Sequence, residues 1–206
     1  MIAGRFFTVR GRNTYIDRVG ASASLGMCLA EWLMVLGVIT ILLALIGSFV
    51  ALSRERARSA MIQADFEMVL QASRRFYAEY QQWPTTFFND FGDTRYGTEE
   101  RSNQEVINAL RGLSGPGNQG HALNPNRIVY VSMAEFSPGL SGLDKNGAFL
   151  DPWGQEYQVV VDSDMNGDCT VERSIHGLVE SEPVLIWSCG PDKRTDTQDD
   201  VVSWGR

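Results

Sequence analysis

The chain has 206 residues, 44% of which are hydrophobic, and its formal net charge at pH 7 is −7. That length is sufficient for one domain with its own hydrophobic core. The acidic balance argues against a protein that binds nucleic acid through its phosphates, because such binding needs clustered lysines and arginines.

The N-terminal part of the chain combines a basic start with a long apolar stretch. Residues 1–26 contain four arginines and one acidic residue, and no charged residue lies between Trp32 and Leu52. As a helix with a rise of ~1.5 Å per residue, this stretch would cross a hydrocarbon core of ~30 Å. Glu31 directly precedes it, and a carboxylate at the edge of a membrane helix is costly unless it is paired or reaches the headgroups.

The residues at the border between these two parts form a specific string. It reads Gly26-Met27-Cys28-Leu29-Ala30-Glu31, followed by the apolar run. This string resembles the prepilin cleavage motif of the type IV pilin-like family. The resemblance implies that residues 1–26 are a cytoplasmic leader, that a prepilin peptidase cuts after Gly26 and methylates Met27, and that residues 27–52 are a transmembrane helix.

The resemblance also implies that Glu31 takes part in filament assembly. Cleavage after Gly26 would create an α-amino cation on Met27. When such helices pack in an apolar bundle, a buried carboxylate and a buried amine each need a partner. Glu31 of one subunit would therefore pair with Met27 of a neighbour, and this pair would fix the register between subunits, as a single polar residue does in a coiled coil.

The helical pattern continues beyond the apolar stretch. Apolar residues recur at steps of three and four, namely Ala57, Ala60, Met61, Ala64, Met68, Ala72, Phe76 and Tyr80. Neither proline nor glycine occurs from Ser48 to Trp83, and Pro84 disfavours a helical conformation in the residue before it. The pattern predicts one helix from about Cys28 to Gln82, with residues 53–83 as its amphipathic half; the alternative is two helices that meet near Ser53.

Residues 84–206 are predicted to form an α+β head in which a small antiparallel sheet packs on the amphipathic half of that helix. A capping box at Ser102 to Glu105 predicts a helix to about Leu110, which Gly112 ends. The predicted strands cover residues 127–131, 157–161 and 184–188, in a sheet of three or four strands, and Phe149-Leu150 precedes a turn signal. Together with the long helical spine, this is the architecture that the resemblance implies, a pilin fold.

Two further segments resemble the major pseudopilins of type II secretion systems. The helix exit, residues 76–86, is similar to the Tyr-rich exit before a Tyr-Pro-Thr turn, with Trp83 in place of the tyrosine. Asp151-Pro152-Trp153-Gly154-Gln155-Glu156-Tyr157 matches their Asp-Pro-Trp-Gly-x-x-Tyr turn between strands. Proline fixes φ and glycine permits a positive φ, so the expected role of this turn is structural.

The segment Gly190 to Trp204 resembles the C-terminal loop that holds a structural calcium ion in those pseudopilins. By position, the implied side-chain ligands are Asp192, Asp199 and Asp200, with Asp196 as a further candidate. Backbone carbonyls near Ser188 and Cys189 would complete the ~6–8 oxygen ligands of calcium. The alternative is an acidic loop without a ligand.

A second, weaker metal site is predicted at Asp162-Ser163-Asp164-Met165-Asn166-Gly167-Asp168. This segment matches the first half of an EF-hand loop, with candidate ligands Asp162, Asp164, Asn166 and Asp168. The bidentate glutamate that should end such a loop is replaced by Arg173. The alternative is a solvated hairpin turn between Val161 and Val171.

Cysteines outside the apolar stretch occur at two positions, Cys169 and Cys189. Their spacing does not fit a zinc site. They could form a disulfide in an oxidising compartment, but spacing alone does not show that their Cα atoms come close enough. The sequence therefore leaves this pairing open.

Taken together, the resemblance implies a structural subunit of a periplasmic pseudopilus that drives type II protein secretion. Its expected partners are further copies of itself in a helical filament, minor pseudopilins, the inner-membrane secretion platform and the prepilin peptidase. The expected location is the inner membrane, with a single pass, a cytoplasmic leader and a periplasmic head.

We expect no enzymatic activity, because the chain lacks a nucleophile elbow, a phosphate-binding glycine loop and a histidine-rich metal motif. Two alternatives stay open: a type IV pilus subunit for adhesion, motility or DNA uptake, and a signal-anchored periplasmic binding module that does not assemble.

Overall fold

The computed structural model describes residues 29–86, 92–169 and 182–204, except for the side chains of residues 46–52. The chain forms two compact units, Met1–Gly47 and Ser48–Arg206, which are considered separately below. One helix, α1, spans Leu29–Tyr80 and contains residues of both units. Its bounds confirm the predicted helix to within two residues at each end, and no break occurs near Ser53. At its C-terminal end, Gln81 takes a positive φ of 54°, and Pro84 follows.

In the first unit, every described side chain of α1, from Leu29 to Leu45, is exposed. Over the part of the chain that the structure describes, no helix combines the length and hydropathy of a membrane span. The predicted span Trp32–Leu52 includes residues 46–52, whose side chains are outside this description. The predicted leader, with Gly26 and the first mature residue Met27, also lies outside the described residues.

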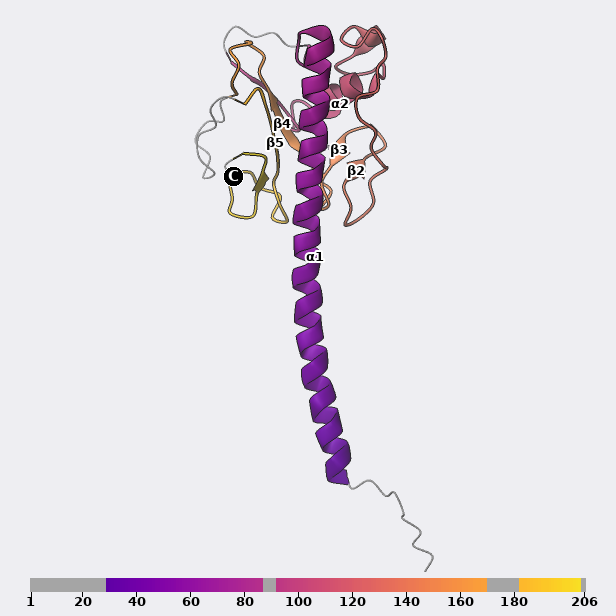
Figure 1. Ribbon diagram of the computed structural model, residues 1–206, viewed down its shortest axis with the longest axis vertical. Helices are drawn as coiled ribbons and strands as arrows, with labels where there is room; N and C mark the ends of the chain where they lie inside the picture. Colours follow the sequence, from indigo (N-terminus) through magenta and orange to yellow (C-terminus); the bar gives the residue numbers. More distant parts are fainter. Residues whose placement is uncertain (1–28, 87–91, 170–181, 205–206) are drawn as a thin grey trace, which may run out of the picture. The chain divides into compact units, whose positions relative to one another are not determined.

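The second unit is a mixed α+β head built around an antiparallel sheet (Figure 1). The sheet has four strands in the order β1-β4-β5-β6, and β2 and β3 form a separate two-stranded pair. The strands are β1 (Thr94–Tyr96), β2 (Gly142–Leu143), β3 (Phe149–Leu150), β4 (Gln158–Val161), β5 (Val184–Ser188) and β6 (Val201–Val202). The strands predicted at 157–161 and 184–188 are confirmed, and the small antiparallel sheet is confirmed with them.

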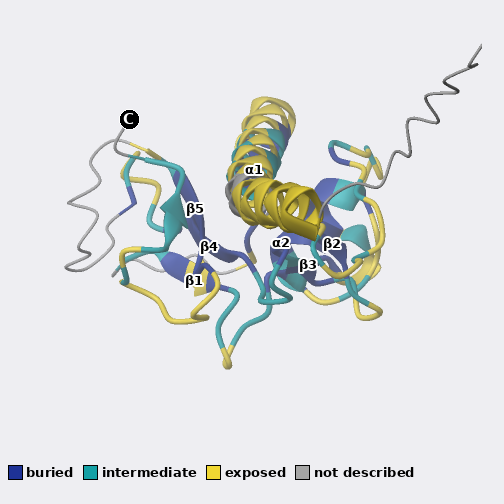
Figure 2. Ribbon diagram, turned by 90° about the horizontal axis from the view of Figure 1, so that it is seen from below, coloured by how far each residue is buried: buried dark blue, intermediate teal, exposed yellow. Residues whose placement is uncertain are grey.

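The two central strands of the sheet, β4 and β5, are buried along their whole length (Figure 2). Side chains alternate between the two faces of a strand. Val159, Val161 and Ile186 therefore point into the main core, whereas Leu185 and Trp187 join a smaller cluster on the other face. Because both faces are covered, these strands are apolar at successive positions instead of alternating with polar ones.

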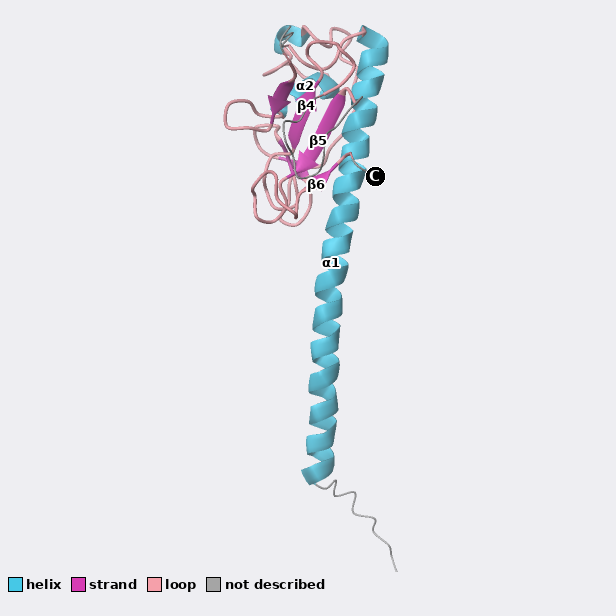
Figure 3. Ribbon diagram, turned by 90° about the vertical axis from the view of Figure 1, so that its left-hand side faces the viewer, coloured by secondary structure: helices cyan, strands magenta, loops and turns pink. Residues whose placement is uncertain are grey.

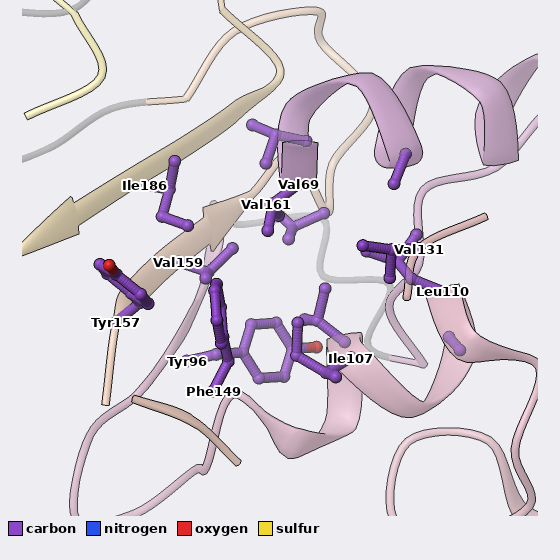
Figure 4. Packing of buried hydrophobic residues seen from close by; sticks show 14 of the residues in the cluster. Val69, Tyr96, Ile107, Leu110, Val131, Phe149, Tyr157, Val159, Val161 and Ile186 are labelled. Atoms are coloured by element: carbon purple, nitrogen blue, oxygen red, sulfur yellow. The ribbon is translucent and has the colours of Figure 1, made fainter. Parts of the chain in front are cut away.

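The second half of α1 packs alongside this sheet (Figure 3). Its buried stripe consists of Ile62, Phe66, Val69, Ala72 and Phe76, at steps of three and four. Figure 4 shows Val69 among the core side chains of the sheet and of α2. The predicted stripe is wrong in its first part, because the small residues at 57, 60 and 64 are exposed. The larger side chains of the observed stripe bury more apolar area, so they set the face that packs.

The short helix α2 spans Gln104–Arg111 and ends, as predicted, at Gly112 in a left-handed conformation with φ of 66°. The predicted capping box is confirmed only in part: the Ser102 hydroxyl accepts from the Gln104 amide at 3.2 Å, whereas the N-cap residue is Asn103, whose side chain forms no capping bond. Instead, the carboxylate of Glu156 accepts hydrogen bonds from the Asn103 amide (2.9 Å) and the Ser102 hydroxyl (3.0 Å). A turn distant in sequence thus supplies the negative charge that helix N-termini favour.

The strand predicted at residues 127–131 is not formed. The side chain of Asn124 bonds to both backbone groups of Ile128: it accepts a hydrogen bond from the Ile128 amide at 2.9 Å and donates one to the Ile128 carbonyl at 2.7 Å. The Tyr130 amide donates to the carbonyl of Leu110, at the end of α2. Arg127 adopts a positive φ of 54°, which interrupts an extended strand. The backbone groups of Ile128 and the amide of Tyr130 are thus bonded without a neighbouring strand.

Candidate functional site

The apolar end of α1 carries one acidic residue, Glu31, in the first turn of the helix. A carboxylate at this position interacts favourably with the positive end of the helix dipole. Large apolar side chains surround it, and most of them are more than half exposed; Leu29, for example, is 78% exposed and Leu33 62%. The described residues of this unit therefore present a continuous apolar surface with a single charged group near its end.

The turn after β3 connects the two sheets of the head through a buried carboxylate. Asp151 is fully buried, and its Oδ1 accepts from the amides of Trp153 (3.0 Å) and Gln155 (2.9 Å). Its Oδ2 accepts from the hydroxyl of Ser188, at the end of β5, at 2.6 Å. Gly154 takes a positive φ of 80° and donates to the Asp151 carbonyl. These bonds agree with the structural role that the Asp-Pro-Trp-Gly pattern predicts.

The aspartates of the C-terminal loop accept hydrogen bonds from the loop itself. Asp199 accepts from the Thr197 hydroxyl at 2.7 Å and from the Asp192 amide at 3.2 Å. Asp200 accepts from the amides of Asp196 (2.7 Å) and Thr197 (3.2 Å). The pKa of Asp199 is lowered, and the hydrogen bond from the Thr197 hydroxyl is the largest cause. The calcium site predicted at Asp192, Asp196, Asp199 and Asp200 stays a prediction that rests on the resemblance.

A different set of carboxylates comes together at one end of the sheet. Among the residues that the structure describes, one group of three acidic side chains offers carboxylate oxygens that all lie within 4.8 Å of one another, namely Asp93, Asp162 and Asp164. Asp93 directly precedes β1 and Asp162 directly follows β4. Two members of the weaker predicted site, Asp162 and Asp164, belong to this group, and Asp93 is a residue that sequence reasoning missed.

The other two predicted ligands of this loop bond within the loop. The side-chain nitrogen of Asn166 donates to the Asp164 carboxylate at 3.1 Å. The side-chain oxygen of Asn166 accepts from the backbone amide of Asp168 at 2.9 Å. Asp168 does not belong to the group of three. Residue 173, which stands where an EF-hand would have its last ligand, lies outside the described residues. The group of carboxylates that the structure brings together thus shares two residues with the predicted ligand set, and its third residue directly precedes β1.

Burial distinguishes Asp162 from its two neighbours, which are half-buried. Asp162 is 2% exposed, and its Oδ2 accepts from the Gly167 amide at 3.0 Å. Its Oδ1 is buried and receives no hydrogen bond. Burial is the largest cause that raises the pKa of Asp162, and the carboxylate of Asp164 raises it further. A buried carboxylate oxygen without a donor is destabilising.

The two described cysteines are free and buried, so the disulfide between Cys169 and Cys189 is not formed. The Cys169 amide bonds to the Glu182 carbonyl before β5, whereas Cys189 follows the other end of that strand. At ~3.3 Å per residue, the strand places the two cysteines roughly 20 Å apart, and a disulfide needs Cα atoms within ~7 Å. Burial raises the pKa of both thiols, to about 12 for Cys189, so neither is a reactive thiolate.

Comparison of this chain with models of protein families, with curated proteins and with solved structures found no match. What the chain does is therefore argued below from its own residues and from the resemblance of its motifs.

Proposed function

We propose that this chain is a pilin-like structural subunit of a periplasmic pseudopilus that drives type II protein secretion. The observation that carries the proposal is the exposed apolar surface of α1 over residues 29–45. A helix that is apolar on all sides needs partners that remove it from water. Each fully buried Leu, Ile or Val gains about 1.5–3 kcal/mol, so this segment has a strong tendency to associate with lipid or with other helices.

The position of Glu31 supports association with copies of the same chain. A simple membrane anchor needs no acid at this point, and a carboxylate near an apolar helix is costly without a partner. After cleavage behind Gly26, the methylated amine of Met27 of a neighbouring subunit would form an ion pair with Glu31. The expected location is the inner membrane, with residues 1–26 in the cytoplasm before cleavage and the head in the periplasm.

The packing of the head on α1 supports a filament that moves its heads together with its helices. The hydroxyl of Tyr157, next to β4, donates to Asp65 on α1 at 2.7 Å. Phe66 contacts the ring of the same tyrosine edge to face, with centroids 5.8 Å apart. Because helix and sheet share one core, a displacement of the second half of α1 carries the head along.

The resemblance of the Asp151–Tyr157 turn and of the C-terminal loop favours a secretion pseudopilus over a surface pilus. The first experiment is N-terminal sequencing and intact mass of the membrane-extracted protein, from cells with and without the prepilin peptidase. We expect a chain that starts at N-methyl-Met27 only when the peptidase is present. An uncut chain in both strains contradicts the proposal and favours the signal-anchored binding module.

Assembly is tested with Glu31→Gln, which removes the charge and preserves the shape of the side chain. Thr40→Val is the matched control, because Thr40 lies on the same exposed segment and bonds only to the Gly37 carbonyl at 2.8 Å. We expect Glu31→Gln to abolish cross-linked oligomers and secretion into the medium, with Thr40→Val unaffected. Normal secretion together with a loss of surface fibres or motility would instead indicate a type IV pilus subunit.

A further inference from the structure

We propose that Asp93, Asp162 and Asp164 form a binding site for Ca2+ that joins the edge strand β1 to the loop after β4. This site is separate from the C-terminal loop and does not depend on the proposed filament function. It also differs from the EF-hand-like set that the sequence predicts, because its third ligand comes from another strand.

The register of the sheet brings the first two carboxylates together. β1 and β4 are antiparallel, and Thr94 pairs with Val161. One step further along the same register, Asp93 stands opposite Asp162. Like charges directly opposite each other on neighbouring strands are destabilising, and the third carboxylate, from Asp164, adds to the repulsion. A divalent cation among the three converts this repulsion into attraction.

A second observation concerns the burial of a single oxygen atom. Asp162 is 2% exposed, and its Oδ1 receives no hydrogen bond, whereas Oδ2 is satisfied by the Gly167 amide. Buried polar groups in proteins are nearly always bonded, so an exception asks for an explanation such as an ion. A cation bound by the three carboxylates would satisfy this oxygen.

The donor set selects the kind of cation. The three ligands are carboxylates, which suit hard cations rather than zinc or copper. Cys169 lies near these aspartates, but burial and their negative charges raise the pKa of its thiol, and its sulfur is not part of the group. Mg2+ usually takes only one or two carboxylates and keeps several waters, whereas Ca2+ accepts about six to eight oxygens in flexible geometry. Three converging carboxylates, two of them half-buried, therefore favour Ca2+ completed by water.

The site would strengthen one edge of the sheet. β1 has three residues, and β4 is the only strand with which it pairs in the described sheet. One further link exists at this end, the hydrogen bond of 2.5 Å between the hydroxyls of Ser163 and Thr94. A cation bound by Asp93 before β1 and by Asp162 and Asp164 after β4 would hold the start of β1 and the end of β4 together. We expect the ion to stabilise the head.

The proposal is tested on the full chain in detergent, by thermal unfolding and titration calorimetry with CaCl2 and with MgCl2 after treatment with EGTA. We expect a rise in Tm and measurable heat with Ca2+, and a much smaller response to Mg2+. Asp162→Asn retains an acceptor for the Gly167 amide, and Asp93→Asn changes a half-buried residue. Both variants should lose the part of the Ca2+ response that Asp199→Asn retains.

Asp199→Asn is the control, because it changes the C-terminal loop and leaves the three carboxylates intact. It should retain the Ca2+ response of the Asp93 site. If Asp162→Asn does not fold, Asp93→Asn alone decides. No response in the unchanged protein, or a response that survives Asp93→Asn and disappears in Asp199→Asn, would overturn the proposal. None of these outcomes depends on cleavage or assembly, so the filament proposal is tested independently.

Discussion

Residues 29–45 and residues 61–80 belong to the same helix, α1, and differ in where their apolar side chains find contacts. In the second segment, five apolar residues form a buried stripe against the sheet of the same chain. In the first segment, every described side chain is exposed, although nearly all are apolar. Apolar content therefore does not decide burial within a chain; the presence of a complementary surface does. The following predictions test this difference, from the largest expected effect to the smallest.

The largest effect is expected for Phe66→Ala compared with Leu36→Ala. Phe66 is 1% exposed in the core, whereas Leu36 is 52% exposed. Loss of a buried phenylalanine typically costs about 3–5 kcal/mol. Unfolding of the head in urea, followed by tryptophan fluorescence, should show this loss for Phe66→Ala and no change for Leu36→Ala. Equal losses in the two variants would mean that the segments do not differ as described.

A smaller effect is expected at α2, where the head again relies on contacts distant in sequence. Glu156→Ala removes the acceptor for the Asn103 amide and the Ser102 hydroxyl, and such caps contribute about 0.5–2 kcal/mol. Glu105→Ala is the control, because no side chain of this helix forms the predicted capping box. Urea unfolding should show the larger loss for Glu156→Ala. A larger loss for Glu105→Ala would mean that the Glu105 side chain caps the helix, as the predicted capping box requires.

The pH dependence of stability provides a third comparison, centred on Asp65 in the second segment. Burial is the largest cause that raises the pKa of Asp65, opposed by hydrogen bonds from Ser141 and Tyr157. Its folded pKa therefore exceeds its unfolded value of ~3.9. Its contribution to stability is fully present below that unfolded value and is lost as the pH rises through the folded pKa.

Asp65→Asn should remove this loss, because an amide is neutral at every pH and its oxygen can still accept from Tyr157. We expect the free energy of unfolding of the variant, relative to the unchanged protein, to increase between about pH 4 and pH 7. Urea titrations in EGTA across this range measure the difference. Parallel curves for the two proteins would show that Asp65 does not titrate differently in the folded state.

The smallest effect is expected for the ion pair between Arg74 on α1 and Glu182, which are 3.5 Å apart and about half exposed. Exposed pairs of this kind contribute about 0–1 kcal/mol. Arg74→Ala should change the free energy of unfolding by no more than this amount, and 0.5 M salt should reduce even that difference. A loss comparable to that of Phe66→Ala would mean that charge, and not apolar packing, joins this segment to the head.

The sequence was most informative where local rules act. The absence of glycine and proline between Ser48 and Trp83 predicted the helix, and β-branched runs bounded by turn residues predicted β4 and β5. Gly112 ends α2 as its position predicted. In these segments the backbone preference and the burial pattern agree, so little depends on distant residues.

Contacts between distant segments could not be read from the sequence. β1 has only three residues, too short for a periodic signal, and its pairing with β4 is what brings Asp93 to Asp162. Glu156 caps α2 from 53 residues away. The packing face of α1 was misassigned because alanines and larger apolar residues share the same spacing, and only the shape of the sheet decides between them. For the same reason, the predicted ligand set contains Asp162 and Asp164 of the acidic group and lacks Asp93.

The buried thiols of Cys169 and Cys189 can be used to measure how often the head opens. A thiol reacts with an alkylating reagent only after the structure around it exposes the sulfur, so the alkylation rate follows the population of open states. One thiol lies beyond each end of β5, so comparing their rates would show whether the sheet opens from one end of this strand or all at once. With Cys28 changed to serine, the alkylation rates can be measured in intact cells. They would then give the fraction of heads that are open under cellular conditions.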